Sequence, residues 1–284
     1  MVKYRGGKSR EVAEMMPFIP GDYERYIEPF FGGGALYFCL MPRRAIINDL
    51  NSKLMSFYSG VRDSFSSLSS ELQELETKYL RNRMVFDEEK RKAPEKRVCD
   101  PNEELYYSIR DMFNGKRDPE YSDAALYYFI NKTAYSGMIR YNSSGDYNVP
   151  YGRYKNFNTR LVTETHATLL KNAEVSTGDY QNIFNLCTSK DFVFLDPPYD
   201  CVFSDYGNKE TRAGFNETEH RRLQEAFYSL PCKALMVMGE TDLIHELYKD
   251  SIIHRYEKSY AVNIRNRFKS ESNHILVANY RMVE

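Results

Sequence analysis

A tetrapeptide, Asp196-Pro197-Pro198-Tyr199, directly follows the apolar run at residues 192–195. Such a run predicts a buried strand, so the tetrapeptide would leave the sheet at its carboxyl end, where open α/β sheets bind ligands. The carboxylate offers acceptor oxygens, the prolines stiffen the turn and leave carbonyl groups, and the tyrosine ring offers a flat face for stacking. Together these groups suit a planar ring that bears an exocyclic amine.

A glycine-rich turn precedes this tetrapeptide in the chain. Residues 26–36 have the pattern of a strand, a turn at Gly32-Gly33-Gly34 and a helix, which allows the backbone to approach a ligand closely. A second strand at residues 45–48 ends in Asp49, about 20 residues further on, where an acidic side chain can meet ribose hydroxyls. Because the turn lacks the G-x-G-x-x-G spacing and the P-loop lysine, it indicates a nucleoside without phosphates.

Six motifs in this order resemble those of the Dam-like, alpha-group adenine-specific N6 DNA methyltransferases, over nearly the whole chain. They are Tyr4-Arg5-Gly6-Gly7-Lys8, Glu28-Pro29-Phe30-Phe31-Gly32-Gly33-Gly34, Asn48-Asp49-Leu50-Asn51, the run from Asn148 to Lys155, Gly178-Asp179-Tyr180 and the Asp-Pro-Pro-Tyr tetrapeptide. The resemblance implies an α/β fold: a Rossmann-like S-adenosylmethionine-dependent methyltransferase sheet with an inserted, mainly helical DNA target-recognition domain. Residues 1–50 and 166–284 would form the catalytic domain, and residues 51–165 the insertion, with a DNA-binding hairpin at about 135–155.

The resemblance also implies an activity and a set of site residues. A methyl group would pass from S-adenosylmethionine to N6 of a flipped adenine in double-stranded DNA, at a short GATC-like or other guanine-adenine-containing site. No metal is expected. The catalytic residues would be Asp196, Pro197, Pro198 and Tyr199. The cofactor would contact Tyr4, Lys8, Glu28, Phe30, Gly32, Gly34, Asp49, Asp179, Tyr180 and Asp196. DNA would contact Lys3, Tyr135, Met138, Arg140, Asn142, Pro150, Arg153 and Lys155.

The chemistry of the tetrapeptide needs no covalent intermediate. If Asp196 and the Pro197 carbonyl accept the two N6 hydrogens, the nitrogen can pyramidalise and its lone pair can point at the methyl group. A base inside a duplex cannot reach such a pocket, so we expect the adenine to flip out and stack on Tyr199. A C5-cytosine enzyme would need a Pro-Cys nucleophile here, and none of the five cysteines lies at this position.

Other functions fit parts of this pattern. An N4-cytosine methyltransferase shares the direct transfer chemistry, and only the shape of the pocket separates it from an adenine enzyme. An RNA or protein methyltransferase also uses a Pro-Pro-Tyr turn to hold an amine or amide. A non-catalytic DNA-binding module would not need both the glycine turn and the tetrapeptide.

The composition describes a globular chain whose charge is unevenly distributed. The chain has 284 residues, a net charge of -1 and a mean hydropathy of -0.62, with no apolar run near the ~20 residues that span a bilayer. Residues 132–160 carry five basic side chains against one acidic, with tyrosines between them, which favours a DNA-reading surface. The cysteines form no C-x-x-C motif and indicate reduced intracellular thiols. We expect a monomer in the cytoplasm of a prokaryotic or phage-infected cell, no membrane partner, and a cognate restriction endonuclease as a partner.

Periodicity predicts the elements that position these motifs. Apolar residues at helical spacing over residues 51–80 predict core helix, and the charged run at 81–97 predicts a solvated helix or a mobile loop. Further helices are expected at 102–113 and 122–135, and after Asn216, where Glu219 completes a capping box. Strands are expected at 174–177 and 233–238, with a final antiparallel pair at about 252–262 and 274–280.

Overall fold

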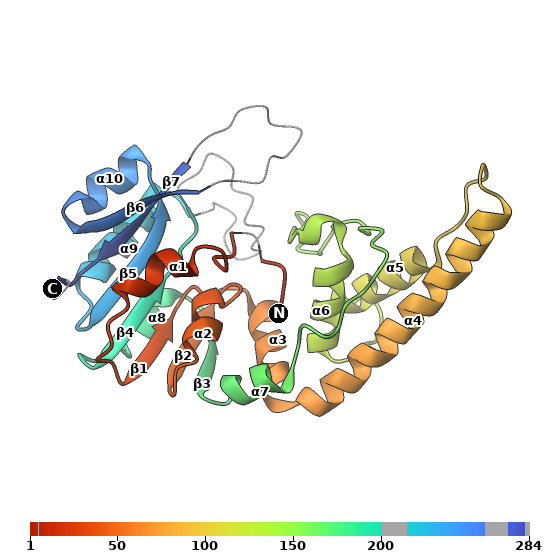
Figure 1. The fold of residues 1–284 in the computed structure, drawn as a ribbon, viewed down its shortest axis with the longest axis horizontal. Helices are drawn as coiled ribbons and strands as arrows, with labels where there is room; N and C mark the ends of the chain where they lie inside the picture. Colours follow the sequence, from red (N-terminus) through yellow and green to blue (C-terminus); the bar gives the residue numbers. More distant parts are fainter. Residues whose placement is uncertain (5, 200–214, 259–271, 282–284) are drawn as a thin grey trace. The chain divides into compact units, whose positions relative to one another are not determined.

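The computed structural model of the chain describes residues 1–4, 6–199, 215–258 and 272–281 (Figure 1). The chain folds into two compact units. The first comprises Met1–Gly7 and Asn51–Thr177, and the second comprises Lys8–Leu50 and the described residues after Thr177. Residues 1–7 and 166–177 thus group with the helical insertion by their contacts, whereas the functional division into catalytic and target-recognition domains stays a prediction.

Six strands of the second unit follow one another in the sheet order β2-β1-β4-β5-β7-β6. They are β1 (Arg25–Glu28), β2 (Ala45–Asp49), β4 (Asp191–Leu195), β5 (Lys233–Gly239), β6 (Ile252–Lys258) and β7 (Ser272–Ala278). The first four in this order are parallel, and β7 is antiparallel to both of its neighbours. The predicted strands and the final antiparallel pair are therefore confirmed, although residues 259–262 lie outside the described part of the chain.

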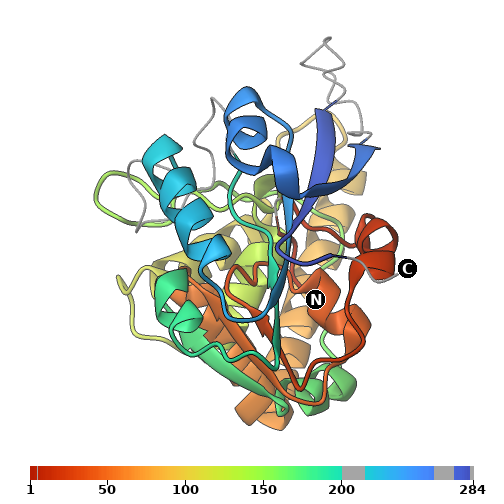
Figure 2. The ribbon, with the colours of Figure 1, turned by 90° about the vertical axis from the view of Figure 1, so that its left-hand side faces the viewer.

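Helices cover both faces of this sheet. Figure 2 shows α9 and α1 on opposite sides of the strands. On one side, α8 (Tyr180–Phe184), α9 (Glu217–Tyr228) and α10 (Asp242–Tyr248) pack on a core that includes Val193 and Leu195. On the other side lie α1 (Val12–Met15), the short helix η1 (Met16–Phe18) and α2 (Ala35–Leu40), where Tyr26 contacts Phe192 with ring centroids 6.1 Å apart. The short helix η3 (Lys249–Ser251) leads into β6. Consecutive residues of β4 thus supply both cores, because side chains alternate along a strand.

The first unit is mainly helical (Figure 1). It contains α3 (Ser52–Asp63), α4 (Phe65–Lys92), α5 (Pro101–Phe113), α6 (Asp123–Thr133), η2 (Tyr135–Gly137), α7 (Glu164–Leu170) and β3 (Ala173–Thr177). Aromatic rings fill its core: the ring centroid of Phe157 lies 5.0 Å from that of Phe129 and 6.0 Å from that of Tyr79. This core gives the loop that follows α6 a rigid base.

Two helices replace the continuous helical pattern of residues 51–80. The helix is interrupted at Ser64, whose backbone angles of φ -136° and ψ 32° are not helical. A second helix, α4, then continues to Lys92. The charged run therefore forms helix over much of its length, and its charges pair along the helix, as in the 2.7 Å contact between Arg83 and Asp87.

None of the helices in the described ranges combines the length and the apolar composition that a membrane span requires.

Candidate active site

Three carboxylates lie at one edge of the parallel sheet. Glu28 ends β1, Asp49 ends β2 and Asp196 follows β4, and these strands are neighbours in the order β2-β1-β4. Parallel strands end at the same edge, so all three side chains are brought to the carboxyl side of the sheet. The predicted position of the Asp-Pro-Pro-Tyr tetrapeptide at a strand end is confirmed.

Asp196 forms an ion pair with Lys8. The Lys8 ammonium lies 2.7 Å from one carboxylate oxygen of Asp196 and 2.9 Å from the other, so it spans both acceptor atoms. Lys8 is 4% exposed and Asp196 is 23% exposed. The same ammonium lies 4.7 Å from the centroid of the Tyr199 ring. A buried cation thus holds the carboxylate and faces the aromatic ring, which links both ends of the tetrapeptide.

The Tyr199 ring occupies the space above a glycine. A Cβ atom added to Gly239, the last residue of β5, would lie 3.3 Å from a ring carbon of Tyr199. Any larger residue at position 239 would press against the ring. The absence of a side chain at Gly239 therefore allows Tyr199 to lie close to the end of β5.

The glycine turn after β1 is tied to the end of β2. Gly32 and Gly34 have φ angles of 47° and 62°, in the left-handed region that favours glycine. The Gly32 amide donates to the Asp49 carboxylate at 2.8 Å, and the side-chain amide of Asn48 donates to the carbonyls of Pro29 and Gly178, at 3.0 and 2.9 Å. Asn48 thus holds two loops of the site together.

Glu28 is the most buried of the three carboxyl groups, at 2% exposure. Burial raises the pKa of the Glu28 carboxyl well above its usual range, the hydrogen bond from Tyr26 at 2.8 Å opposes this, and the charges of Asp196 and Asp49 raise the pKa further. Burial and the two neighbouring carboxylates thus make Glu28 a weaker acid than a free glutamate, and a nearby positive charge would favour its ionised form.

Aromatic and charged side chains surround the start of α8. Asp179 caps this helix, and its carboxylate contacts the guanidinium of Arg222 at 2.6 and 3.1 Å. Burial alone would raise the pKa of Asp179, but the hydrogen bonds from Arg222 and the Gln181 amide lower it. Tyr180 is buried, and its ring lies 5.2 Å from that of Phe30 and 4.8 Å from the Arg222 guanidinium.

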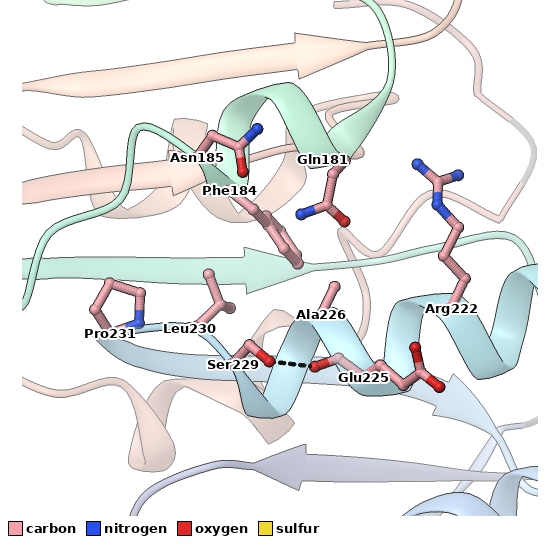
Figure 3. Close-up of a pocket in the computed structure, with 9 residues that line it drawn as sticks. All are labelled: Gln181, Phe184, Asn185, Arg222, Glu225, Ala226, Ser229, Leu230 and Pro231. Atoms are coloured by element: carbon pink, nitrogen blue, oxygen red, sulfur yellow. Dashed lines mark hydrogen bonds between the residues drawn. The ribbon is translucent and has the colours of Figure 1, made fainter.

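A separate pocket of about 290 Å³ lies between α8 and α9 (Figure 3). Its wall consists of Gln181, Phe184, Asn185, Arg222, Glu225, Ala226, Ser229, Leu230 and Pro231. Arg222 and Gln181 bond to Asp179, and the Phe184 ring packs on Tyr180, but none of the lining residues is itself a predicted catalytic, cofactor or DNA residue. The pocket is therefore not the candidate site.

The predicted DNA-contacting residues belong to the first unit, most of them in the loop that follows α6. This loop folds back on itself: Tyr141 pairs with Tyr147, and the Asn142 amide donates to the Asp146 carbonyl at 2.8 Å. Tyr147 is 3% exposed and Tyr151 is 5% exposed, whereas Tyr135 is 57% exposed. The expectation of an aromatic DNA-reading surface is thus too broad, because some of its tyrosines anchor the hairpin to the helical core.

Arg140 and Arg153 sit differently in this loop. Arg140 is exposed, and its guanidinium donates to the side chain and the carbonyl of Asn148 at 2.8 and 3.3 Å, across the hairpin. Arg153 forms an ion pair with Glu103 of α5 at 2.8 Å. Met138, partly exposed, and the exposed Asn142, Pro150 and Lys155 complete the set.

Lys3 lies against the end of α6 within the same unit. Its main-chain amide and carbonyl both bond to the side chain of Asn131, at 2.7 Å each, and its ammonium lies 4.1 Å from the centroid of the Tyr154 ring. Burial and, to a lesser extent, the charge of Lys3 lower the pKa of Lys132 to about 8. This corner thus concentrates positive charge beside the hairpin.

The structure therefore brings together the four catalytic residues and all predicted cofactor residues except Tyr4, within the second unit. Tyr4 belongs to the first unit with every predicted DNA-contacting residue, so its place in the cofactor site stays a prediction.

Comparison with known proteins decides the class of enzyme. A model of the D12 class N6 adenine-specific DNA methyltransferases matches residues 4–264. The chain belongs to this family. It is 33% identical over 288 residues to the Type II methyltransferase M.CviBI of Paramecium bursaria Chlorella virus NC1A, covering 99% of both chains. It is 31% identical over 304 residues to the Type II methyltransferase M.MjaIII of Methanocaldococcus jannaschii, covering 98% of both chains. It is 28% identical over 262 residues to the DNA adenine methylase of Salmonella typhi, covering 89% of this chain and 85% of that protein.

Membership of this family confirms the resemblance that the six motifs indicated. The chain is an adenine-specific DNA methyltransferase, and its α/β sheet agrees with the fold expected for that class. Among the alternatives considered from the sequence, the family favours adenine N6 over cytosine N4 and over a non-catalytic DNA-binding module.

Several residues of this methyltransferase site carried no signal in the sequence. Arg222, Gly239 and His274 contact predicted site residues, but each is far from its partner along the chain. Asn48 belongs to the Asn-Asp-Leu-Asn motif, but the motif did not indicate its bonds to the two loops. A strand-end asparagine next to a predicted ligand residue is the one signal that could have indicated it.

Proposed function

We propose that this enzyme uses S-adenosylmethionine to methylate N6 of an adenine that has left the DNA duplex, at a short GATC-like or other guanine-adenine-containing site. The observation that carries the proposal is the arrangement at the end of β4. There the Asp196 carboxylate, held by Lys8 at 2.7 Å, lies in the same tetrapeptide as an aromatic ring that can stack on a base.

The residues of the site fit this cofactor. When bound, S-adenosylmethionine supplies a methyl group on a positively charged sulfonium, and that methyl is already electrophilic. Glu28, Asp49 and Asp196 make this edge of the sheet acidic, with Lys8 already paired to Asp196. The glycine turn allows the close approach of a nucleoside, and Phe30 and Tyr180 offer apolar surface for its adenine.

Asp196 and the Pro197 carbonyl act on the target amine. The N6 nitrogen of adenine is a poor nucleophile because its lone pair is delocalised into the ring. Two acceptors placed at its hydrogens favour a pyramidal nitrogen, whose lone pair can then point at the methyl group. Lys8 orients the Asp196 carboxylate until the amine donates to one of its oxygen atoms.

Tyr199 would hold the base by stacking after the adenine leaves the duplex. Its ring already lies against Gly239, so the ring is in place before the base arrives. Pro198 stiffens the turn between Pro197 and Tyr199, which limits the movement of the ring relative to Asp196. Preorganisation of this kind lowers the entropic cost of capturing a flipped base.

The hairpin of the first unit would read the sequence around the adenine. Arg140 has the donor geometry for a bidentate contact with guanine, and its bonds to Asn148 orient the guanidinium. Tyr135 and Met138 would lie near the space that the adenine leaves, and Lys3, Arg153 and Lys155 would contact the DNA backbone or bases. Asn142 and Pro150 would shape the hairpin, since each bonds to it through the main chain.

Two relatives are named as Type II methyltransferases, which suggests a cognate restriction endonuclease as a partner of this enzyme. We propose that the enzyme acts as a monomer, in the cytoplasm of a prokaryotic or phage-infected cell.

The product of the reaction tests the proposed function. The purified chain, incubated with S-adenosylmethionine and duplex DNA, is expected to yield N6-methyladenine on nucleoside mass spectrometry. Single-molecule sequencing of the same DNA is expected to place the modification in one short sequence context. N4-methylcytosine as the product, or adenine methylation without sequence context, would contradict the proposal.

Arg140→Ala is expected to lose about 1 to 3 kcal/mol of discrimination at one base pair, because a bidentate contact to guanine is worth that much. The measurement is the methylation rate on duplexes altered one base pair at a time around the adenine, at fixed salt. Arg153→Ala is the matched control, since Arg153 is also exposed but bonds to Glu103 outside the hairpin.

If Arg153 contacts the DNA backbone, Arg153→Ala is expected to weaken DNA binding about equally on all sequences. The salt dependence of DNA binding is then expected to become shallower by about one phosphate. If Arg140→Ala keeps the wild-type ranking of substrates and is only slower, Arg140 contacts the backbone, and Lys3 or the hairpin at 142–154 reads the sequence.

A further inference from the structure

A row of three residues crosses the strands that end the sheet. His274 of β7 lies opposite Gly239 of β5 on one side and opposite Tyr256 of β6 on the other. Residues directly opposite one another on neighbouring strands share a face of the sheet. Because Gly239 has no side chain, the Tyr199 ring fills its place in this row and meets His274 edge-on, with centroids 5.0 Å apart and planes at 85°.

The imidazole of His274 is fixed on several sides. It is 1% exposed, and its Nδ1 lies 2.7 Å from the Oε2 atom of Glu11. The same oxygen accepts the Tyr256 hydroxyl at 2.8 Å, and the Tyr256 ring lies 5.6 Å from that of His274. Glu11 itself is only 6% exposed. A buried imidazole with this bond and these ring contacts has one orientation, so it can fix the orientation of a neighbouring ring.

Glu11 belongs to the same turn as Lys8. The Glu11 amide donates to the Lys8 carbonyl at 2.7 Å, and Glu11 directly precedes α1. Lys8 contacts Asp196 directly. Glu11 bonds to His274, and the His274 ring in turn contacts the Tyr199 ring. One turn thus acts on both ends of the Asp-Pro-Pro-Tyr tetrapeptide.

We propose that Glu11 and His274 are positioning residues of the methyl transfer, which set the plane of the Tyr199 ring relative to Asp196. The inference rests on the proposed stacking of adenine on Tyr199. A ring held in one orientation presents its face to the base without first losing rotational freedom, and the amine then meets Asp196 in a reactive geometry. Neither residue touches the base.

A double-mutant cycle tests whether His274 acts through Tyr199. Single-turnover methylation rates are measured for wild type, His274→Ala, Tyr199→Ala and the double variant. We expect His274→Ala to slow methylation about tenfold in the wild-type background, and less than about twofold when Tyr199 is already alanine. Equal factors in both backgrounds would overturn the inference, since His274 would then act independently of the ring.

A second histidine provides a matched control. His254 of β6 lies 3.2 Å from Glu14, one turn beyond Glu11, but its ring packs on Phe18 and Tyr256. His254→Ala is expected to keep the methylation rate within about twofold of wild type. A loss equal to that of His274→Ala would show a general effect on the sheet and overturn the proposal.

Glu11→Gln keeps the test decisive if His274→Ala fails to fold. This variant keeps the size of the side chain and one oxygen acceptor, so the cycle is repeated with it and Tyr199→Ala, with the same expected non-additivity. The dissociation constant of S-adenosylmethionine is expected to stay within about twofold, and a larger loss would assign the pair to cofactor binding instead. A wild-type chain that does not methylate DNA would refute the proposed function, whereas an active wild type with an additive cycle would refute only this inference.

Discussion

Asp196→Ala is expected to lower kcat at least about a hundredfold while the chain stays folded, because one electrostatic contact that forms fully only in the transition state is commonly worth that much. The variant removes an acceptor of the N6 hydrogens and leaves Lys8 beside the Tyr199 ring without its carboxylate. The measurement is the steady-state rate on a duplex that contains the recognition site, with circular dichroism to confirm the fold.

Glu240→Ala is the matched control for this prediction. Glu240 follows β5, the strand next to β4 in the sheet. It is 24% exposed and pairs with Arg255 at 2.9 Å, so it resembles Asp196 in exposure and pairing. Glu240 lies outside the tetrapeptide. Its replacement is expected to leave kcat within about twofold of wild type. An Asp196→Ala enzyme that retains more than about a tenth of wild-type kcat would refute the role of Asp196.

Tyr199→Ala is expected to damage the enzyme far more than Tyr199→Phe, because the proposed role belongs to the ring and the hydroxyl is incidental. Loss of a base stack costs about 1 to 3 kcal/mol, or about 5-fold to 150-fold in binding of the flipped base. The measurement is the fluorescence of 2-aminopurine at the target position, which reports unstacking of the base, together with the methylation rate of the two variants.

Tyr199→Phe retains the ring above Gly239 and the edge contact with His274, so it serves as the control for packing. Equal damage from both substitutions would show that the hydroxyl makes the decisive bond. The adenine would then need a different stacking partner.

The strands that carry the site could be predicted from local patterns. Residues 192–195 and 234–238 are uninterrupted apolar runs, and both lie in strands that are buried on two faces. The glycine turn could also be predicted from the sequence, since Gly32 and Gly34 adopt the left-handed backbone angles that their lack of a Cβ permits. These features depend on a few adjacent residues, so the sequence suffices to predict them.

The aromatic residues of the hairpin could not be sorted in the same way. Tyr135, Tyr147 and Tyr151 look alike in the sequence, yet Tyr135 is exposed and the other two are buried. Tyr151 meets the hydroxyl of Tyr79 at 2.6 Å, and Asn114 bonds to the main chain of Tyr147 at 2.8 and 3.0 Å. Which tyrosines remain for DNA depends on how the loop packs on α4 and α5, and no local pattern encodes that.

The sequence by itself thus determined the family, the strand and turn that present the Asp-Pro-Pro-Tyr tetrapeptide, and the class of chemistry. Only the tertiary structure paired Lys8 with Asp196, Asp179 with Arg222 and Glu11 with His274. The physical reason is the range of the interactions. Turn chemistry and side-chain alternation act over a few residues. The partners of a buried charge are set by the order and register of the strands, which bring residues 188 and 263 positions apart into contact.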